Sequence, residues 1–166
     1  AIASQRVPEL AIGDRTLSKD APVFVIAEIG NNHNGDLEFA KQLVDAAVDA
    51  GADCVKFQMR DMAALYRNTG DANDAKEDLG SQYVLDLLNK YQLSDDELIQ
   101  IFDYCKEKGT IPLCTPWDEP SVDFLNSYGM QAFKIASADF TNHEFLRLIA
   151  DTRQVMICST GMFTEQ

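Results

Sequence analysis

Five apolar segments of strand length recur along this chain, and amphipathic segments of helical period separate them. The apolar segments are residues 23–27, 54–57, 111–114, 132–136 and 155–158. Continuous apolar runs of this length are typical of strands in a parallel sheet that is covered on both faces. Strands that alternate with helices predict parallel βα units, so the expected fold class is α/β.

The amphipathic segments carry the signals that begin and end helices. Four of them follow a side chain that can cap a helix N-terminus, and three are followed by glycine. The capping residues are Asp36, Ser94, Asp118 and Asn142, and the glycines are Gly51, Gly109 and Gly129. Short polar side chains accept hydrogen bonds from first-turn N–H groups, and glycine adopts the left-handed conformation that ends many helices. A further helix is expected at about residues 81–90.

About five βα units fit either an open doubly wound sheet or a (β/α)8 TIM barrel. A complete barrel needs eight units and roughly 250 residues, whereas this sequence has 166 residues. If the fold is a barrel, residues 21–166 are therefore its first part. Residues 1–20 hold two β-prone pieces around Gly13-Asp14, which predict a small N-terminal hairpin cap. The acidic, irregular segment 60–80 is expected to be a lid or an insertion.

Composition narrows the range of partners. The formal net charge is −13 and the pI is about 4.4. A nucleic-acid surface or a contact with an anionic membrane requires clustered basic residues, so we expect neither partner. An anionic ligand would need a few placed cations to attract it against the negative field of the whole protein. Neither a signal peptide nor a membrane span is visible, and we expect a cytoplasmic protein.

The cysteines do not form a metal or redox motif. They are Cys54, Cys105, Cys114 and Cys158, and no CxxC pair is present. Three lie in strand-like runs and one lies on a predicted helix face. We expect buried free thiols in a reducing compartment.

Two lysines interrupt otherwise apolar strands. Lys56 lies in the segment 54–57 and Lys134 lies in the segment 132–136. A buried lysine needs a partner, because taking an unpaired ammonium group out of water is costly. One interpretation is a lysine that snorkels or pairs with a structural carboxylate. The other, which we favour, is two cations that point into a barrel mouth and hold a phosphate or carboxylate group.

Hydroxyl side chains follow the ends of three predicted strands. They are Thr115, Ser137, Ser159 and Thr160. Active sites of parallel α/β folds collect at the carboxyl ends of strands, so these hydroxyls and nearby N–H groups could cradle a phosphate. The sequence has no P-loop and no GxGxxG motif, so a nucleotide-binding fold has no motif support.

Glu28 stands near the end of the first predicted strand. It could act as a general acid/base, orient a metal-bound water, or pair with a core lysine such as Lys56, and these roles are compatible. His33, alone in its polar turn, is expected to organise the loop through hydrogen bonds rather than bind a metal. Trp117 could equally wall a sugar site or pack at the rim.

Five short motifs occur in order along the chain. They are residues 26–35 (IAEIGNNHNG), 51–58 (GADCVKFQ), 114–116 (CTP), 133–137 (FKIAS) and 159–162 (STGM). This set resembles the N-acetylneuraminate (sialic acid) synthase family, and the match runs from about residue 22 to 163 with natural spacing. Each piece alone is modest, whereas the ordered set is specific. The resemblance implies the N-terminal part of a (β/α)8 barrel.

By this resemblance, the enzyme condenses phosphoenolpyruvate with an open-chain N-acylated hexosamine, typically N-acetylmannosamine. A divalent metal, commonly Mn²⁺ or Mg²⁺, polarises the sugar aldehyde. The enol carbon attacks the aldehyde, water adds at the neighbouring carbon, and phosphate leaves by C–O cleavage. Such chemistry needs cations on the phosphate, a Lewis acid on the carbonyl and a placed water.

The same resemblance gives roles to individual residues. The phosphoenolpyruvate-binding positions are Lys56, Thr115, Lys134, Ser137 and Ser159. Glu28 matches the catalytic carboxylate near the metal and the aldehyde, and Gln58 matches a sugar-contacting position. The metal-binding histidines of the family lie on later strands, so we expect the metal ligands beyond residue 166. Asn68 and Asn73 are candidates for the family's sugar-binding asparagine.

Two alternative functions remain open. Within the class, the product could be another nonulosonic acid, such as legionaminic or pseudaminic acid. From another class, the chain could be a non-catalytic half-barrel that binds phosphorylated ligands, which would not need manganese for turnover.

The family's C-terminal antifreeze-like domain, which reaches across a dimer to the sugar, is not among these residues. We expect a homo-oligomer, in the family a dimer, and expect the two edge strands of the sheet to pair with another segment or to self-associate.

Overall fold

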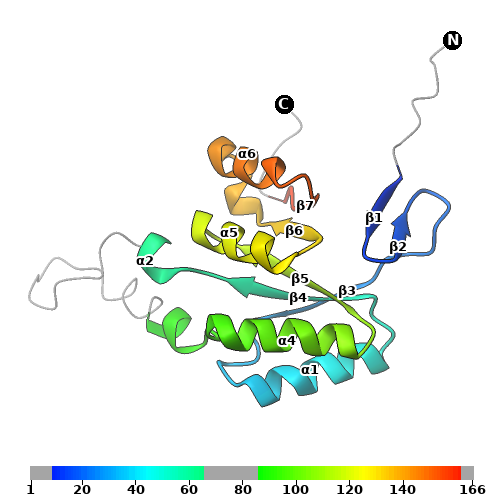
Figure 1. Ribbon diagram of the computed structural model, residues 1–166, viewed down its shortest axis with the longest axis horizontal. Helices are drawn as coiled ribbons and strands as arrows, with labels where there is room; N and C mark the ends of the chain where they lie inside the picture. The colour runs from blue at the N-terminus through cyan, green and yellow to red at the C-terminus, as the bar shows by residue number, and fades with distance from the viewer. Residues whose placement is uncertain (1–8, 66–85, 162–166) are drawn as a thin grey trace, which may run out of the picture.

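The computed structural model describes residues 9–65 and 86–161. Its centre is a five-stranded parallel sheet in the order β3-β4-β5-β6-β7, so each strand lies beside its neighbour in the sequence (Figure 1). The strands are β3 (Ile26–Gly30), β4 (Cys54–Met59), β5 (Ile111–Pro116), β6 (Ala132–Ile135) and β7 (Val155–Cys158). The five predicted strands are present, and the α/β class is confirmed.

Four long helices accompany the strands and begin at the predicted caps. They are α1 (Leu37–Asp49), α4 (Asp95–Glu107), α5 (Glu119–Tyr128) and α6 (His143–Asp151), beside the short helices α2 (Met62–Leu65) and η1 (Ser137–Asp139). Each of the four predicted capping side chains accepts a hydrogen bond from a first-turn backbone N–H group. Residues 86–90 are helical, as expected for the helix at 81–90, whose first residues lie outside the described ranges.

The long helices pack on one face of the sheet. Their apolar residues form a single hydrophobic cluster with alternate strand residues, namely Val55, Phe57, Cys114, Phe133 and Ile135. A doubly wound sheet carries helices on both faces and reverses its strand order. In the described part of the chain the strand order never reverses, which is the arrangement of a TIM barrel. The structure thus decides between the two topologies that the sequence left open.

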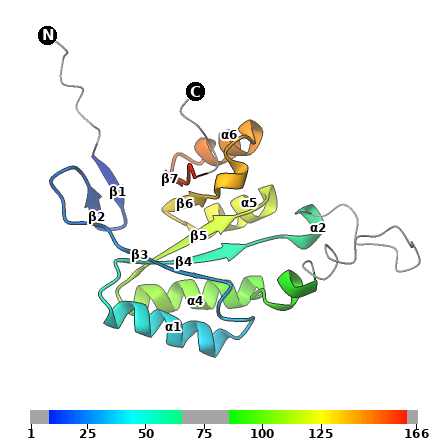
Figure 2. The same cartoon turned by 180° about the vertical axis from the view of Figure 1, so that it is seen from behind.

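A hairpin closes the opposite face where the strands begin. β1 (Leu10–Ile12) and β2 (Arg15–Leu17) pair antiparallel around Gly13-Asp14, as predicted. Ile12 is 1% exposed and forms a second hydrophobic cluster with Cys54, Leu113 and Ala132. In both views the hairpin lies at the end of the sheet away from α2 (Figures 1 and 2). The division into a cap of residues 1–20 and a barrel domain of residues 21–166 remains a prediction.

The first long strand begins three residues later than predicted. β3 starts at Ile26, and the side chains of Val23 and Val25 are 81% and 48% exposed. The Val25 N–H donates a hydrogen bond of 2.7 Å to the Asp53 carboxylate instead of joining a ladder. β3 is an edge of the sheet, so apolar residues just before it have a neighbouring strand on one side only. β3 also ends later than predicted, at Gly30, so Glu28 lies inside the strand rather than at its end.

Three of the four cysteines are buried as expected, and Cys158 is not. Burial raises the pKa of the thiols of Cys54, Cys105 and Cys114 to about 12. The apolar pattern predicts burial of Cys158 too, but this residue ends the edge strand β7 and is exposed. Among the helices that the structure describes, none is long and apolar enough to cross a bilayer.

Candidate active site

The register of the ladders places the predicted site residues on the face of the sheet away from the helices. Glu28 is the Cα partner of Lys56, and Gln58 is the partner of Thr115. Partners in a ladder point to the same side, and side chains alternate along a strand. The residues on either side of Lys134 are buried against the helices, so Lys134 shares this inner face. Polar side chains therefore line the inner face, toward the carboxyl ends of the strands from the β1–β2 hairpin.

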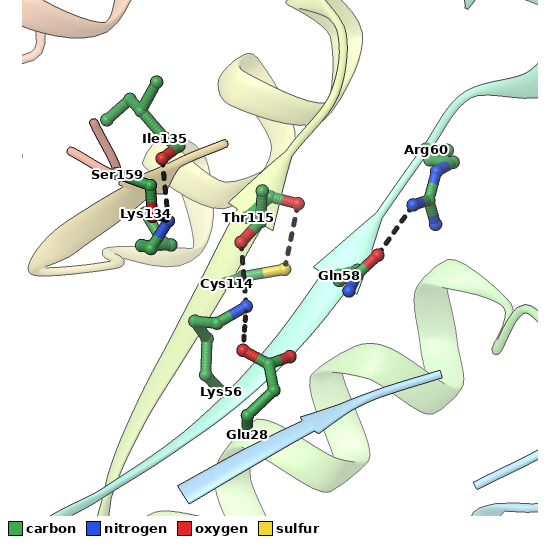
Figure 3. Close-up of polar contacts among 9 residues, drawn as sticks. All are labelled: Glu28, Lys56, Gln58, Arg60, Cys114, Thr115, Lys134, Ile135 and Ser159. Atoms are coloured by element: carbon green, nitrogen blue, oxygen red, sulfur yellow. Dashed lines mark hydrogen bonds and ion pairs between the residues drawn. The ribbon is translucent and has the colours of Figure 1, made fainter. Parts of the chain in front are cut away.

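The ammonium group of Lys56 joins three strands. Lys56 is 7% exposed, and its Nζ lies 2.5 Å from Glu28 Oε2. The same Nζ donates a hydrogen bond of 3.0 Å to Thr115 Oγ1 (Figure 3). The side chain of Glu28 is 50% exposed, so its carboxylate is accessible to solvent and to a ligand. Lys56 thus pairs with a carboxylate, as expected of a structural lysine. It also lies on the inner face, as expected of a lysine that holds an anion.

Lys134 is held by neutral oxygen atoms. Its Nζ donates hydrogen bonds to Ser159 Oγ at 2.6 Å and to the Ile135 carbonyl at 2.7 Å (Figure 3). No ion pair among the described residues includes it. Burial and then the Lys56 charge lower the pKa of Lys134, and Glu28 acts in the opposite direction. The charge of Lys56 thus acts on Lys134 across the inner face that both side chains share.

Gly30 allows Glu28 and Gln58 to approach each other. It has a φ of +56°, and a Cβ built on it would lie 2.9 Å from Glu28 Oε1 and 3.1 Å from Gln58 Nε2. Any side chain at this position would displace one of these groups, and its backbone conformation favours glycine. The carboxylate and the carboxamide therefore border the same small space.

Ser137 and Ser159 lie just past strand ends as predicted, whereas Thr115 lies inside β5, which continues to Pro116. Ser137 is the first residue of η1, directly after β6, and is partly exposed. Ser159 follows β7, and its N–H donates to the Ile135 carbonyl at 3.1 Å. Thr115 and Ser159 thus each accept a hydrogen bond from a lysine. Ser137 is assigned to the site only because it follows β6. The candidate asparagines, Asn68 and Asn73, lie outside the described residues.

His33 organises the turn after β3, as predicted. It is 1% exposed, and its Nδ1 accepts a hydrogen bond of 3.1 Å from the Gly35 N–H. Burial lowers the pKa of His33, and a backbone hydrogen bond and the Glu97 charge oppose this change. Within the described ranges, no three His, Cys, Asp or Glu side chains lie together as a metal site requires.

Arg60 belongs to the site, although sequence reasoning missed it. Its Nη2 donates a hydrogen bond of 2.6 Å to Gln58 Oε1. Its guanidinium carbon lies 4.5 Å from the centre of the Trp117 ring. Arg60 follows β4 directly, and this position at a strand end was the available signal. Its place at the start of the irregular segment 60–80 concealed it.

Asp139 is a second residue that the sequence did not single out. Its Oδ2 is buried and has no hydrogen-bond partner among the described residues. Burial raises the pKa of the Asp139 carboxyl group. The residue ends η1, after the strand that carries Lys134. The residue as a whole is partly exposed, although its Oδ2 atom is buried.

The comparisons with known proteins agree with the motifs. A sequence profile of the NeuB family matches residues 43–166. The chain belongs to the NeuB family. It is 41% identical over 151 residues to the spore coat polysaccharide biosynthesis protein SpsE of Bacillus subtilis, covering 90% of this chain and 40% of that protein. It is 39% identical over 144 residues to the N,N'-diacetyllegionaminic acid synthase of Legionella pneumophila, covering 84% and 40%.

A solved structure shows the same architecture. The chain superposes on the N-acetylneuraminic acid (sialic acid) synthetase of Leptospira borgpetersenii, solved in complex with citrate, with a TM-score of 0.80 at 28% identity. The match covers 95% of this chain and 51% of that chain. The predicted fold, part of a TIM barrel with an N-terminal hairpin, is confirmed. This chain spans about 40% of the length of the two curated NeuB relatives named above.

Proposed function

We propose that this chain carries the phosphate-binding half of the active site of a sialic-acid-type synthase. The reaction condenses phosphoenolpyruvate with an N-acylated hexosamine, N-acetylmannosamine, to a nonulosonic acid and releases phosphate. The protein is then a carbon–carbon bond-forming transferase. The observation that carries this proposal is the convergence of Lys56 and Lys134, from different strands, on one polar inner face.

The lysines and hydroxyls bind the phosphoenolpyruvate. Its phosphate and carboxylate are anions, and two ammonium groups in a partly desolvated site attract them more strongly than exposed lysines would. The binding set is Lys56, Thr115, Lys134, Ser137 and Ser159. Lys134 donates to neutral oxygens in the absence of an anion, so it can turn a donor to the ligand without breaking an ion pair.

Glu28 serves as the acid/base group. The enol carbon of phosphoenolpyruvate forms a bond to the aldehyde carbon, and water adds to the neighbouring carbon. The C–O bond to phosphate then breaks, and phosphate leaves with the bridging oxygen. As that C–O bond breaks, the hydroxyl that the water leaves on the carbon gives its proton to the phosphate and becomes the keto group. The aldehyde oxygen gains the other proton of the water. The half-exposed Glu28 carboxylate, held by Lys56, is placed to accept or return this proton.

Gln58 contacts the sugar beside Glu28, because both groups border the space above Gly30. A divalent metal, Mn²⁺ or Mg²⁺, would supply Lewis-acid chemistry at the aldehyde. The described residues do not offer a ligand set that fits such an ion. We expect its ligands outside these residues.

The identity of the acceptor sugar is a choice between close alternatives. The legionaminic acid synthase of Legionella shares 39% identity with this chain, which supports a legionaminic acid precursor as the alternative acceptor. A panel of N-acyl hexosamines, assayed at equal concentration, separates the two by their kcat/KM values. Pseudaminic acid precursors belong in the same panel.

Phosphate release tests the function itself. The assay contains phosphoenolpyruvate, N-acetylmannosamine and Mn²⁺, with the protein at its natural length and with the 166-residue chain. Release by the longer form alone supports the proposal, and release by both would show that this chain supplies more of the site than proposed. Release by neither, with any sugar of the panel, favours a non-catalytic module that binds phosphorylated ligands.

We also infer a homodimer in the cytoplasm. Buried free thiols are typical of proteins in a reducing compartment. β3 and β7 are the edges of the described sheet, so the 166-residue chain by itself should self-associate through them, whereas the further strands of a complete barrel would pair them. The dimer of the longer protein is what the family resemblance implies. Analytical ultracentrifugation of the natural-length protein should show a dimer, and a stable monomer would contradict this.

A further inference from the structure

Arg60 holds the Gln58 carboxamide in one orientation. Gln58 Oε1 accepts the hydrogen bond of 2.6 Å from Arg60 Nη2. A guanidinium group has donors only, so the carboxamide oxygen must face Arg60 and the NH2 group must face away. That NH2 nitrogen and the Glu28 carboxylate both border the space above Gly30, where a Cβ would lie 3.1 Å from Gln58 Nε2 and 2.9 Å from Glu28 Oε1.

The loop after β5 fixes Arg60 from one side. The guanidinium group lies over the Trp117 ring, 4.5 Å from its centre, in a cation–π contact. The backbone N–H of Trp117 donates to the Met59 carbonyl at 3.1 Å. This bond continues the β4–β5 ladder beyond the last strand pair, so the backbone that carries the Trp117 ring is held in register with β4.

Asp118 fixes the residue that follows Arg60. One carboxylate oxygen accepts a hydrogen bond of 2.7 Å from the Asp61 N–H, and the other accepts one of 2.8 Å from the Ser121 N–H. Asp118 is 8% exposed and caps α5. A buried carboxylate that caps a helix and also holds a loop is costly to move. Arg60 is therefore positioned by the Trp117 ring that it lies over and by the next residue, Asp61, which Asp118 holds.

We propose that Arg60, lying over Trp117, is a positioning residue that fixes Gln58 as a hydrogen-bond donor to the acceptor sugar, an inference that rests on the proposed function. Because Arg60 already occupies the carboxamide oxygen, the sugar atom opposite Gln58 is an acceptor. A hydroxyl or N-acyl carbonyl oxygen fits, and an N–H group does not. Without Arg60 the carboxamide can turn over and present its oxygen, so this selection is lost.

Arg60→Met in the natural-length protein tests the proposal. We expect the KM for the acceptor sugar to rise about tenfold, the effect of one misdirected hydrogen bond. The KM for phosphoenolpyruvate should change less than about twofold, because both lysines keep their partners. Trp117→Phe, which keeps a smaller ring, should shift the sugar KM in the same direction by less. Arg147→Met, at an exposed arginine of α6, is the matched control and should change neither constant.

A double-mutant cycle separates positioning from direct binding. In a Gln58→Ala background, Arg60→Met should have no further effect on the sugar KM, since no carboxamide remains to be oriented. An undiminished effect in that background, or an unchanged KM in the single variant, would overturn the proposal.

Failure of the proposed function is a different outcome, recognised when the wild-type protein turns over none of the sugars. A crystal structure of the Arg60→Met protein then decides the positioning role alone. A Gln58 side chain that leaves its wild-type position supports the role. An unchanged Gln58 side chain overturns it.

Discussion

Lys56 and Lys134 are both inner-face lysines of a parallel sheet, yet their surroundings differ. Lys56 lies between the Glu28 carboxylate and the Thr115 hydroxyl. Lys134 donates to a hydroxyl and a carbonyl, and burial lowers its pKa. The charge of Lys56 is thus balanced by the protein, whereas no carboxylate of the described residues forms an ion pair with Lys134.

This difference separates two tasks within one phosphate site. A balanced lysine keeps its geometry before any ligand arrives, and it holds Glu28 in place. A lysine with neutral partners bears a desolvation cost that an incoming anion offsets. We infer that Lys56 organises the site and that Lys134 attracts the anion.

Lys56→Met should have the largest effect. It removes a cation from the phosphate site and also releases Glu28, so we expect kcat/KM to fall on the order of 1,000-fold. The free energy of unfolding should fall by only about 1 kcal/mol, because the half-exposed Glu28 carboxylate can be hydrated. Steady-state phosphate release and urea denaturation measure the two quantities. Near-normal turnover in this variant would mean that the ion pair is structural alone.

Lys134→Met should have a smaller effect on activity and the opposite effect on stability. We expect kcat/KM to fall about 100-fold, through the KM for phosphoenolpyruvate. The free energy of unfolding should stay constant or rise, because the desolvation of Lys134 disappears with its charge. The same urea denaturation compares both lysine variants. A loss of stability equal to that of Lys56→Met would remove the distinction between the two residues.

The pH dependence of phosphoenolpyruvate binding sharpens the comparison. The pKa of Lys134 is lowered, so its neutral form accumulates at a lower pH than that of an exposed lysine. A neutral amine does not attract phosphate, and affinity should fall as the pH rises through this lowered pKa, by up to about tenfold per pH unit. Measurements of the KM between about pH 7 and 10 test this. Lys134→Arg should abolish the decline, because a guanidinium group stays charged.

Much of this site could be read from the sequence because charge in an apolar strand is a strong signal. Lys56 and Lys134 stand out on that ground alone, and the structure places both on the inner face. The pairing of Glu28 with Lys56 was one of the roles expected and is present. The assignment of these residues to substrate binding stays a prediction.

Other features depend on neighbours that a single sequence does not reveal. Arg60 was hidden because it begins the irregular segment 60–80 and because its ring partner, Trp117, comes from the end of another strand. The start of β3 was misplaced because an edge strand leaves apolar residues such as Val23 exposed. Cys158 was misjudged for the same reason. The pattern of apolar residues predicts that a segment is a strand, but it does not show how many other strands flank it.

Removal of either of two hydroxyl groups should have the smallest effects. The two variants should differ in how far they raise the KM for phosphoenolpyruvate. Thr115 is 3% exposed and accepts from Lys56, so Thr115→Val leaves a buried donor without one partner, and we expect the KM for phosphoenolpyruvate to rise about tenfold. Ser159 is only partly buried, so water can replace its hydroxyl beside Lys134, and Ser159→Ala should raise the KM about threefold. Thr141→Val, at an exposed threonine, is the control. The reverse order would mean that Lys134, not Lys56, depends on a fixed hydroxyl, and the roles of the two lysines would then be exchanged.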